Sequence, residues 1–318
     1  MRAELGGTTT MTLRILTGVA GALVAASAHG QTPISLGTAT PGGGFPVYGA
    51  AFAEVVNAND PTLRIEPRNT KGSTENVPLL ESGALDIALV QGEVANPVLA
   101  KPDASLRIVT AMYSSPGMFV VRGDSPYRAI ADLRGKPVAL GAQGSGLTIL
   151  GRNVLAAIGI DPDRDIQAIY LERAGDGPAM VLDGRAAALW GAGVGWPGFT
   201  AVAKAGGRFI APDAEEVKRI LTKQPLLKPM TMPAGSYPGQ DSPVATVGSW
   251  SFVLARRGLP DEAAYRIARA LHKGEASLGA KLAQARETTA ANTVAAAPRA
   301  DLIHPGVAKY LREAGLLR

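Results

Sequence analysis

The sequence predicts an α/β protein of two lobes, with a ligand cleft between the lobes and a helical C-terminal tail. Three observations lead to this prediction: strand and helix patterns alternate, the alternation begins twice, and only helical patterns follow position 260. Alternation of this kind is typical of a sheet covered by helices. The chain has 318 residues, of which 46% are hydrophobic, so it is long enough for two hydrophobic cores.

The first alternation covers residues 31–121. An apolar run that begins at Ile34 ends at three consecutive glycines, Gly42-Gly43-Gly44, and a helical pattern follows them. A second helical pattern begins at Ser73, which we expect to be its N-cap, and ends at Gly83. The further strands expected in this lobe cover residues 63–68, 85–91, 106–113 and 118–122.

The pattern begins again in a second lobe of residues 122–249. A loop of small residues, Gly144-Ser145-Gly146, separates a strand from a helix there, as the glycine loop does in the first lobe. The chain then returns, so residues 31–121 and 250–318 together form the first lobe. The strands expected after position 122 cover residues 137–141, 166–171, 186–190, 208–211 and 246–255. The helices expected there cover residues 125–133, 147–158, 177–182, 215–221, 261–272, 277–289 and 307–316, and residues 290–297 are a connector or a frayed helix.

The first thirty residues are expected to be an export signal rather than part of the fold. An apolar run over residues 15–25 follows a basic residue and precedes small residues, which is the layout of a secretory signal peptide. We expect cleavage near Ala28 to Gln31, with Met11 as a second candidate for the first residue. No later segment is apolar and uncharged over the length of a membrane span, so we expect a soluble exported protein.

Composition narrows the classes of function. The chain contains no cysteine, which excludes disulfides, thiolate nucleophiles and cysteine metal sites. The net charge is +5, but the basic residues form no stripe of the kind that nucleic-acid-binding proteins use. We therefore expect no metal, no cofactor and no nucleic-acid partner.

The two glycine loops are candidates for an anion site. Glycines allow a close approach of backbone N–H groups, and the first N–H groups of a helix are unpaired and carry partial positive charge. The loops at Gly43 and Gly44 and at Gly144 to Gly146 come at the carboxyl ends of strands, where α/β sheets bind ligands. The alternative for each loop is a tight turn that binds nothing.

Polar and aromatic side chains follow several of these strands. Hydroxyl and amide groups at strand ends can hydrogen-bond a small polar ligand, although each alone could be a cap or a loop residue. Tyr48 and Tyr113 are walls of the cleft or core aromatics, and Trp196 either covers the cleft or packs its own loop onto its lobe. The polar candidates are Thr38, Thr40, Thr70, Ser73, Asn76, Gln91, Ser114, Ser145 and Thr148.

A catalytic site is not evident. The two histidines after the leader, His272 and His304, lie far from any candidate nucleophile in the pattern, and Ser145 lacks the first glycine of the G-x-S-x-G motif. We therefore expect a binding protein and no enzyme.

The chain resembles the TAXI-type solute receptors of tripartite ATP-independent periplasmic (TRAP) transporters, within the type II periplasmic binding proteins. The resemblance extends from about Ile34 to Leu316, and the order and spacing of its motifs make it specific. The motifs are residues 42–49 (GGGFPVYG), 70–76 (TKGSTEN), 86–91 (DIALVQ), 133–138 (LRGKPV), 144–148 (GSGLT), 234–241 (AGSYPGQD), 246–248 (TVG) and 304–306 (HPG).

The resemblance implies a periplasmic receptor that closes on a small carboxylate or amino acid, glutamate-like or dicarboxylate. It also implies delivery of that ligand to the membrane permease subunits of a TRAP transporter, and we expect a monomer. The ligand-binding residues that it implies are Gly43, Gly44, Tyr48, Thr70, Lys71, Gly72, Ser73, Asn76, Gln91, Tyr113, Ser114, Gly144, Ser145, Gly146, Thr148 and Trp196.

Two positions depart from the family pattern. Lys71 stands where a second glycine is more common, and Trp196 stands where a histidine is common. A lysine that faced the cleft would add a full positive charge for a carboxylate, whereas an outward lysine would only be solvated. Two other functions stay open on the sequence: a ligand-sensing partner of a membrane histidine kinase, and an exported enzyme.

Overall fold

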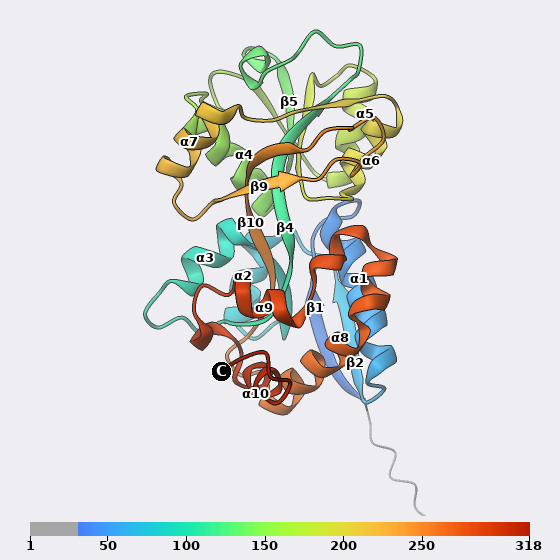
Figure 1. Cartoon of the computed structure of the whole chain (residues 1–318), viewed down its shortest axis with the longest axis vertical. Helices are drawn as coiled ribbons and strands as arrows, with labels where there is room; N and C mark the ends of the chain where they lie inside the picture. The colour runs from blue at the N-terminus through green and yellow to red at the C-terminus, as the bar shows by residue number, and fades with distance from the viewer. Residues whose placement is uncertain (1–30) are drawn as a thin grey trace, which may run out of the picture. The chain divides into compact units, whose positions relative to one another are not determined.

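The computed structural model describes residues 31–318, so the expected signal peptide lies outside the described residues. The described chain contains ten strands and ten helices (Figure 1). The strands are β1 (Thr32–Gly37), β2 (Leu63–Arg68), β3 (Ile87–Gln91), β4 (Arg107–Val121), β5 (Pro137–Ala142), β6 (Gln167–Leu171), β7 (Ala188–Ala192), β8 (Arg208–Ile210), β9 (Lys228–Met232) and β10 (Val244–Ala255). The helices are α1 (Gly44–Asn59), α2 (Ser73–Glu81), α3 (Gly92–Leu99), α4 (Gly146–Ala157), α5 (Gly177–Leu182), α6 (Pro197–Lys204), α7 (Ala214–Lys223), α8 (Asp261–Lys281), α9 (Ala290–Ala296) and α10 (Pro305–Glu313). Short 3-10 helices are η1 (Ile130–Leu133), η2 (Ala174–Asp176), η3 (Ala283–Glu287) and η4 (Ala300–Leu302).

The strands follow the order β2-β1-β3-β10-β4-β7-β5-β6, with β9 paired to β10 and β8 paired to β4. In the first lobe β1, β2 and β3 are parallel, and in the second lobe β5, β6 and β7 are parallel. The strands β4 and β10 are antiparallel to their neighbours. Parallel strands joined through helices place their carboxyl ends at one edge, which is the edge that faces the other lobe.

Two long strands join the lobes, as the pair β4 and β10 in Figure 1 shows. Residues 107–116 of β4 pair with β10, whereas its last residues, from Gly117 on, pair with β7 and β8. The predicted boundary at 121/122 lies at the end of β4, and the predicted boundary at 249/250 lies within β10. We keep both as the proposed division between the lobes.

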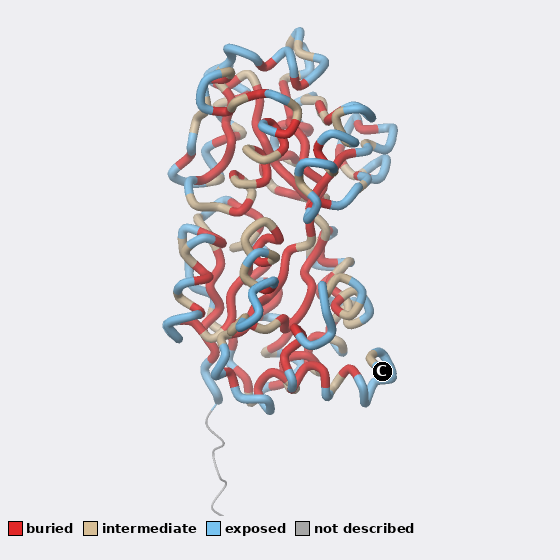
Figure 2. Tube along the Cα trace, turned by 90° about the vertical axis from the view of Figure 1, so that its left-hand side faces the viewer, coloured by how far each residue is buried: buried red, intermediate tan, exposed pale blue. Residues whose placement is uncertain are grey.

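Each sheet is covered by helices on both faces. In the first lobe α1, α8 and α10 pack on one face and α2 and α3 on the other. Residues of β4 contribute to both cores: Val109 and Met112 on one side, Ile108 and Ala111 on the other. In the second lobe α4 and α7 cover one face and α5 and α6 the opposite face. Figure 2 shows the buried residues along the strands of both lobes. The predicted fold class is confirmed.

Several predicted boundaries were wrong. The two strands expected over 106–113 and 118–122 are one continuous strand, β4, because Ser114 and Ser115 remain in the sheet and pair with β10. The helices expected over 261–272 and 277–289 are largely the single helix α8, in which Gly274 packs against Val55 of α1. The helices α3 and α6 were not expected. No helix within residues 31–318 combines the length and the apolar character needed to cross a membrane.

A buried ion pair fastens α1 to α8. The Asp60 side chain is buried and accepts hydrogen bonds from Arg266 Nη2 at 2.7 Å and Nε at 2.9 Å. Burial opposes the charged form of Asp60, but the hydrogen bonds from Arg266 and Thr62 outweigh it and lower the pKa of Asp60 to about 2.

We expect Asp60→Asn to lower the free energy of unfolding by about 2 kcal/mol at pH 7. A depressed carboxyl pKa adds stability above the unfolded-state value near 4, and this stability is lost as the pH falls toward 2. The loss caused by the substitution should therefore shrink at pH 2.5, as measured by urea unfolding followed by circular dichroism.

The matched control is Asp124→Asn, because Asp124 pairs with Arg122 on the exposed surface and should matter little. An equal loss for Asp60→Asn at both pH values would mean that packing, not charge, is responsible.

Candidate functional site

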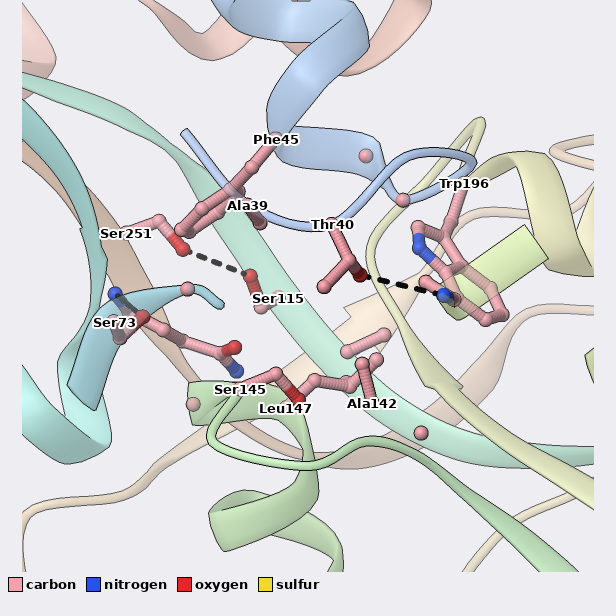
Figure 3. A pocket seen from close by; sticks show the side chains of 18 of the residues that line it. Ala39, Thr40, Phe45, Ser73, Ser115, Ala142, Ser145, Leu147, Trp196 and Ser251 are labelled. Carbon is pink, nitrogen blue, oxygen red and sulfur yellow. Dashed lines mark hydrogen bonds between the residues drawn. The ribbon is translucent and has the colours of Figure 1, made fainter. Parts of the chain in front are cut away.

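A cavity of about 70 Å³ lies where the two lobes meet. Its walls come from the ends of strands and the starts of helices in both lobes (Figure 3). The predicted site residues that line it are Gly43, Gly44, Gly72, Ser73, Gln91, Tyr113, Ser145, Gly146 and Trp196. Thr40, one of the polar candidates, also lines it. The lining residues that were not predicted are Ala39, Phe45, Ser115, Gly141, Ala142, Leu147, Ala174, Ala192 and Ser251.

Five helices begin at this cavity. The residues that cap or open α1, α2, α3, α4 and α6 all line its wall: Gly43, Ser73, Gln91, Ser145 and Trp196. No side chain caps α1, α2, α3 or α6, whereas in α4 the Ser145 hydroxyl accepts a hydrogen bond from Thr148 N. Helix starts leave backbone N–H groups unpaired and carry about half a positive charge each. The cavity therefore favours a negative charge, although no charged side chain lines it.

Glycine makes this convergence possible. A methyl group on Gly146 would lie 2.7 Å from Gln91 Cβ and 3.0 Å from Ser73 Oγ, so only glycine lets the start of α4 approach α2 and α3. Ser73 was predicted as the N-cap of α2, and this was wrong: Gly72 is the cap, and the Ser73 hydroxyl accepts a hydrogen bond from Gln91 N at 3.1 Å. That bond joins the start of α2 to the end of β3.

The rest of the wall is mostly apolar. Trp196 is 6% exposed, and its ring contacts the start of α1 and stacks edge-on against Phe199 at 5.1 Å. Trp196 therefore both lines the cavity and packs into the core of its own lobe. Burial and the neighbouring Tyr48 raise the pKa of the Tyr113 phenol, which stays neutral and can donate a hydrogen bond. The pattern of small and aromatic residues suits an apolar ligand body beside an anionic group.

Seven predicted site residues do not line the cavity, and most of them hold its walls in place. Asn76 donates hydrogen bonds to Thr38 O and Leu89 O, both at 2.8 Å, and so fixes the ends of β1 and β3. The other six are Tyr48, which hydrogen-bonds Thr288; Thr70, which donates to Thr38 O; Ser114, which donates to Glu287; Thr148, which donates to Ala142 O; Gly144, which accepts from Thr74; and Lys71, which is exposed.

The mouth of the cavity is closed by contacts between the lobes. Thr74 on α2 donates a hydrogen bond from Oγ1 to Gly144 O at 2.6 Å. Ala174 N donates to Thr40 Oγ1 at 3.3 Å, which is the dashed line at Thr40 in Figure 3. Gly42 lies directly against Gly175 across this mouth. The lobes are therefore in direct contact beside the cavity. Among residues 31–318 no three histidine or acidic side chains are placed to hold a metal.

Solved structures share this fold. A structure titled as that of a periplasmic transporter superposes with a TM-score of 0.55 at 14% identity, covering 80% of this chain and 87% of its own. A protein from Bordetella bronchiseptica RB50 superposes with a TM-score of 0.51 at 14% identity, covering 81% of this chain and 77% of its own. At these identities the likeness concerns the fold. The chain belongs to the NMT1-like family, whose model matches residues 36–315.

We expect Gly42→Ala to hold the lobes apart. A methyl group on Gly42 would lie 2.5 Å from Gly175 Cα, and the neighbouring backbone cannot yield as a flexible side chain could. Small-angle scattering should give a larger radius of gyration for this variant than for the wild type.

The control for backbone strain is Gly83→Ala. Gly42 and Gly83 have φ values of 82° and 78°, so alanine costs about 1–2 kcal/mol at either position, but nothing lies within 4 Å of a methyl group on Gly83. Gly83→Ala should scatter like the wild type. Identical scattering from all three proteins would show that contact at Gly42 does not limit closure.

Proposed function

We propose that this protein is a periplasmic solute receptor that closes its two lobes on a small organic anion and delivers it to a membrane transporter. The observation that carries the proposal is the meeting of five helix starts around a cavity without a charged side chain. Unpaired backbone N–H groups at helix starts are a general means of binding carboxylate, sulfonate or phosphate groups. A binding cleft between two lobes that close by a hinge is the arrangement of periplasmic binding proteins.

The size of the cavity favours a compact ligand. Its volume of about 70 Å³ is larger than one water molecule needs, and it is small for a ligand cleft. We propose that a monocarboxylate of the size of pyruvate suits this cavity better than glutamate does. Because no charged side chain lines the wall, a second carboxylate or an ammonium group would have no ionic partner. We therefore propose a small monoanion with an apolar body, in preference to a glutamate-like or dicarboxylate ligand.

The transport role rests on the sequence resemblance to TRAP receptors and on the fold shared with a structure titled as that of a periplasmic transporter. Export by the signal peptide would place the receptor in the periplasm, and a TRAP-type permease would be its membrane partner. The absence of a recognisable catalytic set in the sequence supports binding rather than turnover. We propose that the protein acts as a monomer, without a metal or cofactor.

The direct test is thermal melting of the purified protein with five acids: pyruvate, lactate, ethanesulfonate, L-glutamate and 2-oxoglutarate. A ligand that binds only the folded protein raises the melting temperature by mass action, and at 100 times its Kd it adds about 2.7 kcal/mol of stability. We expect the three small monoanions to give larger shifts than L-glutamate and 2-oxoglutarate.

The control for site binding is Gly146→Val, whose side chain would fill the space between Gln91 and Ser73 and should abolish the shift. A shift that survives in this variant would place the anion elsewhere. No shift with any of the five acids would contradict the proposed function.

A further inference from the structure

A second group of polar atoms lies behind the cavity wall. Glu93 is the second residue of α3, and both of its carboxylate oxygens are buried without a hydrogen-bond partner among the described residues. Gln91 Nε2 and Ser249 Oγ are also buried, and neither has a partner within residues 31–318. Ser249 on β10 and Gln91 are the polar side chains that face the Glu93 carboxyl. Three polar side chains therefore meet beneath the start of α3, where Ser249 and Gln91 favour the ionised Glu93 carboxyl but lie outside good hydrogen-bond geometry.

Gln91 connects this group to the cavity. It is 5% exposed, it ends β3 and caps α3, and its side chain lines the cavity beside Gly146. A methyl group on Gly92 would lie 2.6 Å from Ser249 Oγ, so the start of α3 is pressed against β10 at this point. The Gln91 amide thus lies between the space available to an anion and the Glu93 carboxyl.

Within residues 31–318 no cationic side chain contributes to the ionisation of Glu93, and the favourable charge beside it is the partial positive charge at the start of α3. Helix α3 packs mainly against α2, α4, β3 and β10, and neither strand contains a charged residue. Lys228 on β9 and Arg299 line a hollow beside α3 but do not contribute to the ionisation of Glu93. Glu75 and Glu81 on α2 do not contribute to the ionisation of Glu93, and Arg152 on α4 is paired with Asp163. Burial raises the pKa of Glu93 to about 7, with Ser249 and Gln91 opposing that rise. The carboxyl therefore changes its charge near neutral pH.

We propose that Glu93 is a positioning residue which, through Gln91, couples the binding of an anion in the cavity to the uptake of a proton. The inference rests on the proposed function, since it concerns the same cavity. An anion and an ionised Glu93 would be two negative charges in a buried region without a cation, so binding favours the neutral carboxyl. A neutral Glu93 can also donate a hydrogen bond, which satisfies one of the buried acceptors around it.

The sign of the coupling follows from linkage. If the bound anion raises the pKa of Glu93, the complex holds more protons than the free protein near pH 7, and affinity increases as the pH falls. A rise of one pKa unit corresponds to a Kd about fivefold lower at pH 6 than at pH 8.

The test is calorimetric titration of the intact protein with pyruvate, or with the acid of the panel above that gives the largest melting shift. All five acids keep the same charge between pH 6 and pH 8. We expect the wild type to bind about fivefold more tightly at pH 6 than at pH 8 and to take up a fraction of a proton at pH 7, measured from the binding enthalpy in phosphate and in Tris buffer. Glu93→Gln should bind with one Kd at both pH values and take up no proton.

Glu81→Gln is the matched control, because Glu81 is an exposed carboxylate at the far end of α2 and should leave the pH dependence unchanged. A pH-independent Kd in the wild type, or a pH dependence that survives in Glu93→Gln, overturns this inference and leaves the proposed function standing. If Glu93→Gln does not fold, proton uptake by the wild type still decides the matter. Absence of binding by all five acids overturns the proposed function and this inference with it.

Discussion

The convergence of helix starts is the constraint on which the rest of the site depends. Five helices direct their first N–H groups toward one cavity, and four of them have no side-chain cap. Within residues 31–318 no side chain caps these four helices, and in α2 the Thr74 N–H donates to the Gly144 carbonyl of the other lobe at 3.3 Å. An anion between the lobes can satisfy helix starts from both lobes together. The same interaction would therefore stabilise the bound ligand and the closed arrangement.

The sheet topology brings these helix starts together. In each lobe the helices that follow parallel strands begin at the same edge of the sheet. The long strands β4 and β10 place these edges of the two lobes opposite each other. Several polar side chains maintain this geometry instead of facing a ligand. Asn76 ties the end of β1 to the end of β3, and Ser114 ties β4 to Glu287 in η3. The cavity wall is thus largely backbone and small side chains, supported by polar groups one layer away.

Two carboxyl groups of the first lobe, those of Asp60 and Glu93, differ in the hydrogen bonds that they accept. Asp60 receives hydrogen bonds from Arg266 and Thr62, and these lower its pKa. Ser249 and Gln91 face Glu93 without good hydrogen-bond geometry, burial outweighs their effect, and the pKa of Glu93 is raised. A paired carboxylate of the first kind fastens helices together, whereas an unpaired one beside a ligand cavity makes protonation sensitive to what the cavity holds. The Asp60 carboxyl therefore stabilises the fold in its charged form, whereas the Glu93 carboxyl is proposed to act at the site in its neutral form.

The sequence by itself determined the fold class, because the alternation of strand and helix patterns and the glycine stops are local signals. It also located the glycine loops that reach the cavity, since glycines between a strand and a helix mark a close approach. It did not reveal α3, α6 or Glu93: short helices carry weak periodicity, and a carboxylate in such a segment looks like a solvated residue. Only the tertiary structure decided that Lys71 is exposed, that Asn76 and Thr148 bond to backbone, and that the carboxylate oxygens of Glu93 are buried. The physical reason is that burial and hydrogen-bond partners come from elements distant in the chain, here α3 against β10 and one lobe against the other.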